Sequence, residues 1–204
     1  KQARDLLSDR NAHLEAEIEH RLHDILLTQD VTIYALAELA ETRDNETGNH
    51  IRRTQGYVRI LAERLQHHPR FADFLTKRNI GLLIKSAPLH DIGKVGIPDQ
   101  VLLKPGKLNA EEWVVMQTHA KLGADAIERA LGRADRSIDF LVGARQIAHH
   151  HHEKWDGSGY PDGLKGDAIP IPARLMALAD VFAALISVPI CWCSTSPPTG
   201  SMQR

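Results

Sequence analysis

Apolar residues recur at intervals of three and four through residues 2–42, and neither Gly nor Pro interrupts them. Such spacing places side chains on one face of an α-helix, so the segment is predicted to form one long helix. The apolar stripe consists of Leu7, Leu14, Ile18, Leu22, Ile25, Ile33 and Leu36.

The same stripe indicates how this helix is used. Two successive steps of four, from Leu14 through Ile18 to Leu22, depart from a strict heptad and are typical of a short coiled coil with a stutter. We therefore expect parallel homodimerisation through the helix. Because Asn11 and Gln29 lie on the stripe and dilute it, a single amphipathic helix packed on its own domain remains the alternative.

Shorter helical patterns follow, and none of the remaining sequence shows the strict alternation of a strand. Pro88 is expected to kink or restart the second of the shorter helices, and Asn109 to cap the third. The fold class is therefore predicted to be all-α, a helical bundle preceded by the long N-terminal helix. The shorter helices are predicted over 49–67, 71–91, 109–131 and 137–152, with a last helix from about 173 through Asp180.

These patterns divide the chain into three parts. Residues 1–42 form a helical linker or coiled coil, and 43–186 form the domain. Residues 187–204 lack periodicity and are expected to be a disordered tail, in which Cys191 and Cys193 are a weak metal-binding candidate. The first residue is not Met, so we expect a fragment of a longer protein whose domain is incomplete at its C-terminal end.

The composition limits the kinds of partner that the chain is expected to bind. Hydrophobic residues make up 43% and charged residues 25%, with a net charge of −1, so no global basic field favours DNA. Any anionic ligand must be held by a local site. No apolar run approaches the ~20 residues that span a bilayer, and no signal peptide is visible. The scarcity of Cys fits a reducing compartment, so we expect a cytoplasmic protein.

The 12 His residues are clustered, and several accompany carboxylates on separate predicted helices. A single His or Asp on a helix is usually a hydrogen-bonded core or surface residue. Burying many of them together without ions is costly, whereas divalent cations accept mixed nitrogen and oxygen ligands. The residues in these places are Glu46 and His50, His90 and Asp91, His119, the run of His151, His152 and Glu153, and Asp180.

Several motifs carry a family resemblance. LHDIGKVGIPD at 89–99 resembles the core motif of HD-domain phosphohydrolases. The segment 151–180 is similar to the HD-GYP subfamily, named for its His-Asp and Gly-Tyr-Pro motifs, the latter here Gly159-Tyr160-Pro161. Matching blocks in the same order also occupy 46–53 and 104–127, so that the resemblance covers about 35–186.

The resemblance implies metal-dependent hydrolysis of cyclic di-GMP to pGpG, GMP or both. It also implies two or three divalent ions, often iron and sometimes manganese. Carried over by motif, their ligands would be Glu46, His50, His90, Asp91, His119, His151, His152 and Asp180. Asp91 would then bridge metals, and Glu46 would serve a third one. His90 and Asp91 would be catalytic through these ions.

The resemblance assigns the substrate side as well. Lys94, in the HDIGK motif, would neutralise phosphoryl oxygens or assist the leaving oxygen, rather than being a solvated lysine. Tyr160 and Trp155 either stack on guanine or brace the loop that contains Gly159 and Pro161. Arg174 is expected to pair with a carboxylate or a phosphate. His149 and His150 are expected at the edge of the site or on the surface.

Two departures keep other functions open. Where the family has Asp-Val-Phe-Asp, this chain has Ala183 in place of the second Asp, and the resemblance stops after Ile186. The first hypothesis is an active phosphodiesterase, the output part of a signalling protein with an upstream sensor or receiver domain. The second is a non-catalytic module that binds metal or cyclic di-GMP. The third is a hydrolase of another cyclic dinucleotide.

Overall fold

The computed structural model describes residues 2–43 and 49–187, and this part of the chain contains helices and loops but no strand. The all-α prediction is therefore confirmed. The α-helices are α1 (Gln2–Glu41), α2 (His50–Leu65), α3 (Lys77–Ser86), α4 (Asp99–Leu102), α5 (Ala110–Leu131), α6 (Asp139–His150) and α7 (Ile171–Ser187), and the 3-10 turns are η1 (Ala87–Leu89), η2 (Ile92–Gly96) and η3 (Gly166–Ala168).

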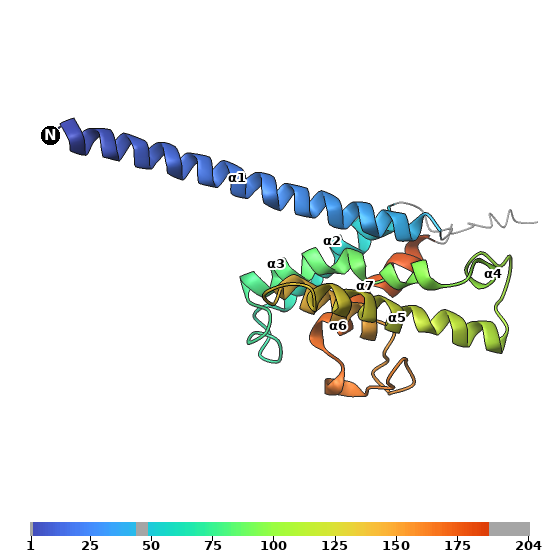
Figure 1. The fold of residues 1–204 in the computed structure, drawn as a ribbon. Coiled ribbons are helices and arrows are strands. Elements are labelled where there is room, and N and C mark those ends of the chain that lie inside the picture. The colour runs from blue at the N-terminus through green and yellow to red at the C-terminus, as the bar shows by residue number, and fades with distance from the viewer. Residues whose placement is uncertain (1, 44–48, 188–204) are drawn as a thin grey trace, which may run out of the picture.

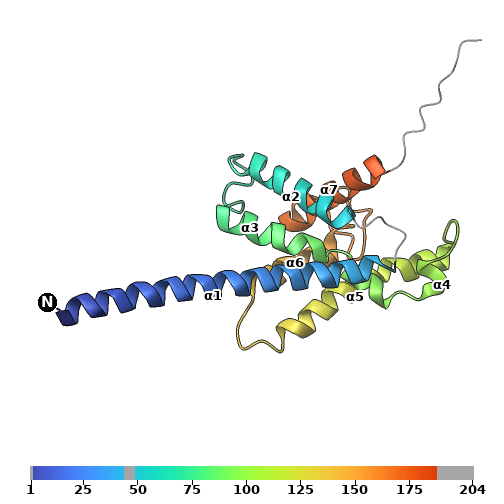
Figure 2. The same cartoon turned by 90° about the horizontal axis from the view of Figure 1, so that it is seen from above.

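Helix α1 lies along one side of the bundle with its C-terminal half and extends beyond it with its N-terminal half (Figures 1 and 2). The bundle is built from α5 against α6 and η2, and from α2 against α7 and α3. Helix α1 contacts η1 and η2, the two turns that flank His90 and Asp91. Among the described residues, no helix combines the length and apolarity that crossing a membrane would require.

Two apolar clusters hold the bundle together. The larger joins α2, α3, α6 and α7 around the fully buried Val58, Ile147 and Met176. The smaller contains Phe140 of α6 and Ile127 of α5, and it includes Ile33 of α1. Because Ile33 is part of this core, the second half of α1 belongs to the domain and is not only a linker.

Helix boundaries follow local capping. The helix predicted over 71–91 begins only at Lys77, because the Thr76 side chain accepts a hydrogen bond from the Asn79 amide and caps α3. Residues 71–74 form turns instead. At Pro88 the chain leaves α3 and continues as η1, as predicted. The predicted cap at Asn109 is also confirmed, as a complete capping box with Glu112.

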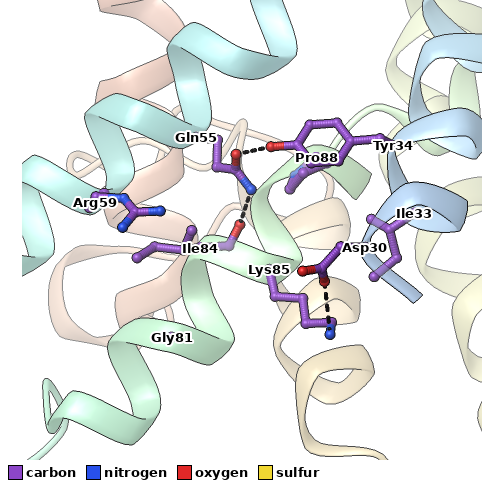
Figure 3. Close-up of a pocket in the computed structure, with 9 residues that line it drawn as sticks. All are labelled: Asp30, Ile33, Tyr34, Gln55, Arg59, Gly81, Ile84, Lys85 and Pro88. Carbon is purple, nitrogen blue, oxygen red and sulfur yellow. Dashed lines mark hydrogen bonds and ion pairs between the residues drawn. The ribbon is translucent and has the colours of Figure 1, made fainter. Parts of the chain in front are cut away.

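A polar contact fastens α1 to α2 and α3, beside a cavity of about 370 Å³ (Figure 3). Tyr34 of α1 donates to the Gln55 side chain, whose amide nitrogen donates to the carbonyl oxygen of Ile84 at 2.8 Å. The Lys85 ammonium lies 2.9 Å from Asp30 and 2.7 Å from the side-chain oxygen of Gln29. Gln29, a polar member of the apolar stripe, thus contacts α3 of its own domain.

Gly93 allows η2 to approach α5 closely. A Cβ atom added at Gly93 would overlap the carbonyl oxygen of His119 and the amide nitrogen of Gly123. Backbone atoms cannot move aside as the end of a flexible side chain can. This approach brings the Asp91 segment next to the helix that carries His119.

We predict that Gly93→Ala lowers the free energy of unfolding by about 1–3 kcal/mol, because the added methyl forces two backbone segments apart. Gly81→Ala is the matched control, since nothing lies within 4 Å of a Cβ atom at Gly81 inside α3. Alanine should stabilise that helix position by up to about 1 kcal/mol. Urea denaturation of both variants measures the difference, and equal stabilities would contradict the close packing of Gly93.

Candidate metal centre

Five segments converge on one buried centre. His90 and Asp91 follow η1, and His119 lies in the middle of α5. His151 and His152 follow the last residue of α6. His50 begins α2, and Asp180 lies on α7. Segments far apart in the sequence thus bring imidazoles and carboxylates together, as the sequence predicts.

The side chains form two adjoining groups. In each group, the candidate ligand atoms lie within 4.8 Å of one another. The groups are Asp91, His119, His151 and His152, and His50, His90 and Asp180.

Asp91 connects the two groups through its two carboxylate oxygens. Its Oδ1 lies 3.3 Å from Nε2 of His119 and 3.4 Å from Nε2 of His151. Its Oδ2 lies 3.4 Å from Nε2 of His90. In the second group, Oδ1 of Asp180 lies 3.2 Å from Nε2 of His50 and 3.8 Å from Nε2 of His90. A carboxylate in this position can serve both groups.

Backbone carbonyl groups orient the imidazole rings. Nδ1 lies 3.1 Å from the Ala87 carbonyl oxygen in His90, 2.7 Å from that of Met116 in His119 and 3.0 Å from that of Ile147 in His151. A proton on Nδ1 leaves the lone pair on Nε2, the arrangement common in metal-binding histidines.

The inward-facing atoms fit divalent metal ions. Within the described part of the chain, Nε2 of His90, His119 and His151 and Oδ1 of Asp91 are buried without a hydrogen-bond partner. Buried polar atoms left in this state are costly and uncommon. Cations that bind imidazole nitrogen and carboxylate oxygen would satisfy all four atoms at once.

The protonation states also suit metal binding. Burial lowers the pKa of His90 to about 4, although Asp91 and Asp180 oppose the shift. Burial, with His151 and His119, lowers the pKa of His152 to about 2. Both rings are therefore neutral near pH 7, as ligation requires.

The two carboxylates are ionised. Burial alone would raise the pKa of Asp91. The charge of His90, which is protonated in the acidic range where Asp91 titrates, and the charge of Lys94 outweigh burial and hold the pKa well below its usual range. Burial is likewise outweighed at Asp180, where the hydrogen bond from His50 and the charge of His90 lower the pKa to about 2. The centre thus presents two anionic carboxylates together with the neutral imidazoles of His90 and His152.

Lys94 lies at the border of the centre. Its ammonium is 2.8 Å from Oδ2 of Asp91, and its side chain is largely buried. It is therefore not a solvated lysine in this structure.

The Gly-Tyr-Pro loop packs on one ligand. The Tyr160 ring stacks on His152, with centroids 4.7 Å apart and planes inclined by 27°. Burial raises the pKa of the Tyr160 phenol, which stays protonated. A Cβ atom at Gly159 would overlap the backbone of Lys154, so the loop needs glycine there to fold back on the end of α6. Pro161 follows Tyr160 in the same turn.

Trp155 and Arg174 contact each other at the outer part of the loop. The Trp155 ring is 55% exposed, with the Arg70 and Arg174 guanidinium groups at 5.1 Å and 5.9 Å from ring centroids. Arg174 also lies 2.8 Å from a carboxylate oxygen of Asp167. Two guanidinium groups thus lie near the Trp155 ring, and Arg174 pairs with a carboxylate.

Glu153 was named in the sequence beside His151 and His152, but no role was assigned to it. Its buried carboxylate accepts hydrogen bonds from the amides of Asp162 at 2.8 Å and Leu164 at 2.9 Å, and so fixes the loop to the end of α6. Its position directly after the two His residues marked it as notable, whereas the distant amides that it binds gave no sequence signal.

Other predicted residues are either outside the described part of the chain or outside the two groups. Glu46, the proposed ligand of a third metal, falls outside the described residues, as do Cys191, Cys193 and all of the tail except Ser187. His149 and His150 are partly buried and form a separate group with Asp162. Ala183 is fully buried on α7, so the aspartate of the family at this position would also be buried.

Comparison with known proteins gives consistent matches. A family model described as HD domain matches residues 34–192. A Vibrio cholerae protein named "Probable cyclic di-GMP phosphodiesterase" is 53% identical over 186 residues, which are 91% of this chain and 42% of that protein. A second, named "Cyclic di-GMP phosphodiesterase", is 57% identical over 173 residues, or 83% of this chain and 34% of that protein.

A third relative from the same organism has a different named substrate. The "3'3'-cGAMP-specific phosphodiesterase 2" is 42% identical over 175 residues, covering 86% of this chain and 31% of that protein. The chain therefore spans less than half the length of these three relatives.

We predict that Glu153→Gln speeds hydrogen exchange at the Asp162 and Leu164 amides by at least about tenfold, since bonds to a charged acceptor contribute about 1.5–3 kcal/mol. Glu128→Gln is the control, because Glu128 forms an exposed ion pair with Arg145. Exchange measured by NMR should not change at the loop in that variant. Unchanged loop exchange in Glu153→Gln would show that the carboxylate does not hold the loop.

Proposed function

The chain belongs to the HD-domain family, in its HD-GYP type, and from this premise we propose that it is a metal-dependent phosphodiesterase that hydrolyses cyclic di-GMP to pGpG, GMP or both. The observation that supports this most is the convergence of buried imidazole and carboxylate atoms from five segments. The names of two similar relatives support the substrate.

The proposed metal ligands are the residues of the two groups. Asp91, His119, His151 and His152 would hold one divalent ion, and His50, His90 and Asp180 a second, with Asp91 shared. Glu46 is the proposed ligand of a third ion, and iron or manganese is the proposed metal. Bound divalent ions supply Lewis acidity that activates water and offsets phosphoryl charge.

The protein's own residues bind and orient the substrate. Lys94, next after His90, helps to keep Asp91 ionised through its 2.8 Å ion pair, and its charge would also stabilise the developing charge on a phosphoryl oxygen. Tyr160, fixed against His152, would offer a stacking surface for guanine. The exposed ring of Trp155 would be a second surface, and Arg174, with Gly159 and Pro161, would shape the loop around the substrate.

A second cyclic dinucleotide is an alternative substrate, because one relative is named for 3'3'-cGAMP. A non-catalytic binding module is the other alternative, favoured by Ala183 where the family has Asp. Both alternatives retain the metal centre. In the first, a different cyclic dinucleotide is hydrolysed; in the second, the protein binds metal or cyclic di-GMP without hydrolysing it.

We predict that anaerobically purified protein holds at least two divalent ions per chain, and that Asp91→Ala and His119→Ala each lose metal. Hydrolysis of cyclic di-GMP should fall in parallel by at least about 100-fold, since even groups that only support a metal ligand change affinity or activity 10–100-fold. His67→Ala is the control, because His67 is exposed at the end of α2. Elemental analysis and chromatography of the products measure both effects.

The outcomes separate the hypotheses. If the protein has its full metal content and hydrolyses 3'3'-cGAMP but not cyclic di-GMP, then 3'3'-cGAMP is the substrate. If it has its full metal content and hydrolyses neither, it is a binding module. Protein without metal, or Asp91→Ala protein that retains it, would contradict the proposal.

We also propose that the N-terminal part of α1 pairs in parallel with a second copy and connects the domain to an upstream sensor or receiver domain. Its apolar stripe is exposed at Leu14, Ile18, Leu22 and Ile25. Burying such side chains contributes about 1.5–3 kcal/mol each when it is complete. Helix shifts in a dimer of this kind can transmit a signal, and α1 contacts the turns beside His90 and Asp91.

Replacing Leu14, Ile18 and Leu22 together with Ser should weaken dimerisation by at least about 100-fold, which corresponds to a loss of about 2.7 kcal/mol. Ile60→Ser, at an exposed apolar position on α2, is the control and should leave the dimer intact. Sedimentation equilibrium gives the dissociation constants. A wild-type chain that is monomeric at high micromolar concentration would refute pairing through α1.

A further inference from the structure

A second group of potential ligands lies outside the metal centre. His149 and His150 end α6, and Asp162 belongs to the loop, directly after Pro161. One ligand atom from each residue lies within 4.8 Å of the others. None of these residues has a role in the proposed hydrolysis.

The distances within this group suit a small cation. Oδ2 of Asp162 lies 3.0 Å from Nε2 of His149 and 3.6 Å from Nδ1 of His150. Tetrahedral Zn²⁺, with bonds of about 2.0–2.2 Å to nitrogen and oxygen, sets its ligands roughly 3.3–3.6 Å apart. Small side-chain movements would bring all three atoms to that separation.

Hydrogen bonding within the group does not satisfy all of its buried polar atoms. His149 and Asp162 form an ordinary hydrogen bond. Within the described residues, however, Nδ1 of His150 is buried without a hydrogen-bond partner, although it lies on the same side as the Asp162 carboxylate. A cation between the three residues would satisfy this nitrogen as well.

The surroundings provide space for further ligands. The group borders a cavity of about 330 Å³ that is also lined by Asp125 and Glu128. Lys121 and Arg145, each 3.0 Å from its partner, balance the charges of these two carboxylates. Asp162 therefore supplies the carboxylate beside the two imidazoles, and the cavity leaves room for water as a further metal ligand.

We propose that His149, His150 and Asp162 form a peripheral site for a late first-row divalent metal ion, specifically Zn²⁺. Two imidazoles and one carboxylate are typical zinc ligands. The ion would join the end of α6 to the loop whose Tyr160 stacks on His152. Zn²⁺ would therefore stiffen the loop beside the main centre. Binding of Zn²⁺ at this peripheral site does not depend on which substrate the main centre hydrolyses.

The test compares bound Zn²⁺ in otherwise identical proteins. After equilibrium dialysis at micromolar free Zn²⁺, Asp162→Asn and His149→Gln should each hold one equivalent less than their parent, with affinity for that equivalent reduced at least about tenfold. The same difference should appear in a His119→Ala background, which separates this site from the main centre. His20→Gln is the control, since His20 and Asp24 form an exposed pair on α1 at 3.5 Å.

A second readout is thermal stability. In the His119→Ala background, Zn²⁺ should raise the melting temperature, and Asp162→Asn should abolish that increase. Circular dichroism checks that each variant folds, and His149→Gln replaces Asp162→Asn if the latter does not. Equal Zn²⁺ content in parent and variants, or the same loss in the His20→Gln control, would overturn the proposal.

Discussion

The whole domain is organised around buried polar atoms that cannot satisfy one another. Nε2 of His90, His119 and His151 and Oδ1 of Asp91 face a common interior without hydrogen-bond partners among the described residues. An arrangement of this kind is costly in an apolar core, and it persists only where another group compensates for it. Divalent cations are a group that these atoms suit, and the proposed metal site accounts for the way these polar atoms are packed together.

The close packing shows how the chain holds these atoms together. Gly93 lets η2 approach the backbone of α5, so that Asp91 lies next to His119. Carbonyl oxygens of the preceding turns orient the imidazoles. Glu153 and Gly159 fold the loop back so that Tyr160 stacks on His152. The contacts of α1 with η1 and η2 join the N-terminal helix directly to the segment of His90 and Asp91.

The sequence allowed the fold class and the converging segments to be predicted, because helical periodicity and family motifs are local signals. Interactions between distant segments were not predictable from those signals. The helix expected from residue 71 begins at Lys77, because capping by Thr76 decides its start. Gln29 was expected only to dilute a dimer stripe, and it contacts Lys85 of its own domain. From the sequence, Trp155 was expected either to stack on guanine or to brace the loop. Only the structure reveals the guanidinium groups of Arg70 and Arg174 near its ring. Glu46 and the tail lie outside the described residues.

The most direct measurement is anomalous X-ray diffraction from crystals of anaerobically purified protein, collected at the absorption edges of iron and manganese. We predict at least two anomalous peaks, each about 2.0–2.2 Å from its nearest ligands, with Nε2 of His119 and His151 around one and Nε2 of His90 around the other. Asp91 should contact both peaks. An ordered centre with water molecules in place of metal, or peaks located only elsewhere on the protein, would contradict the claim that these residues exist to hold metal ions.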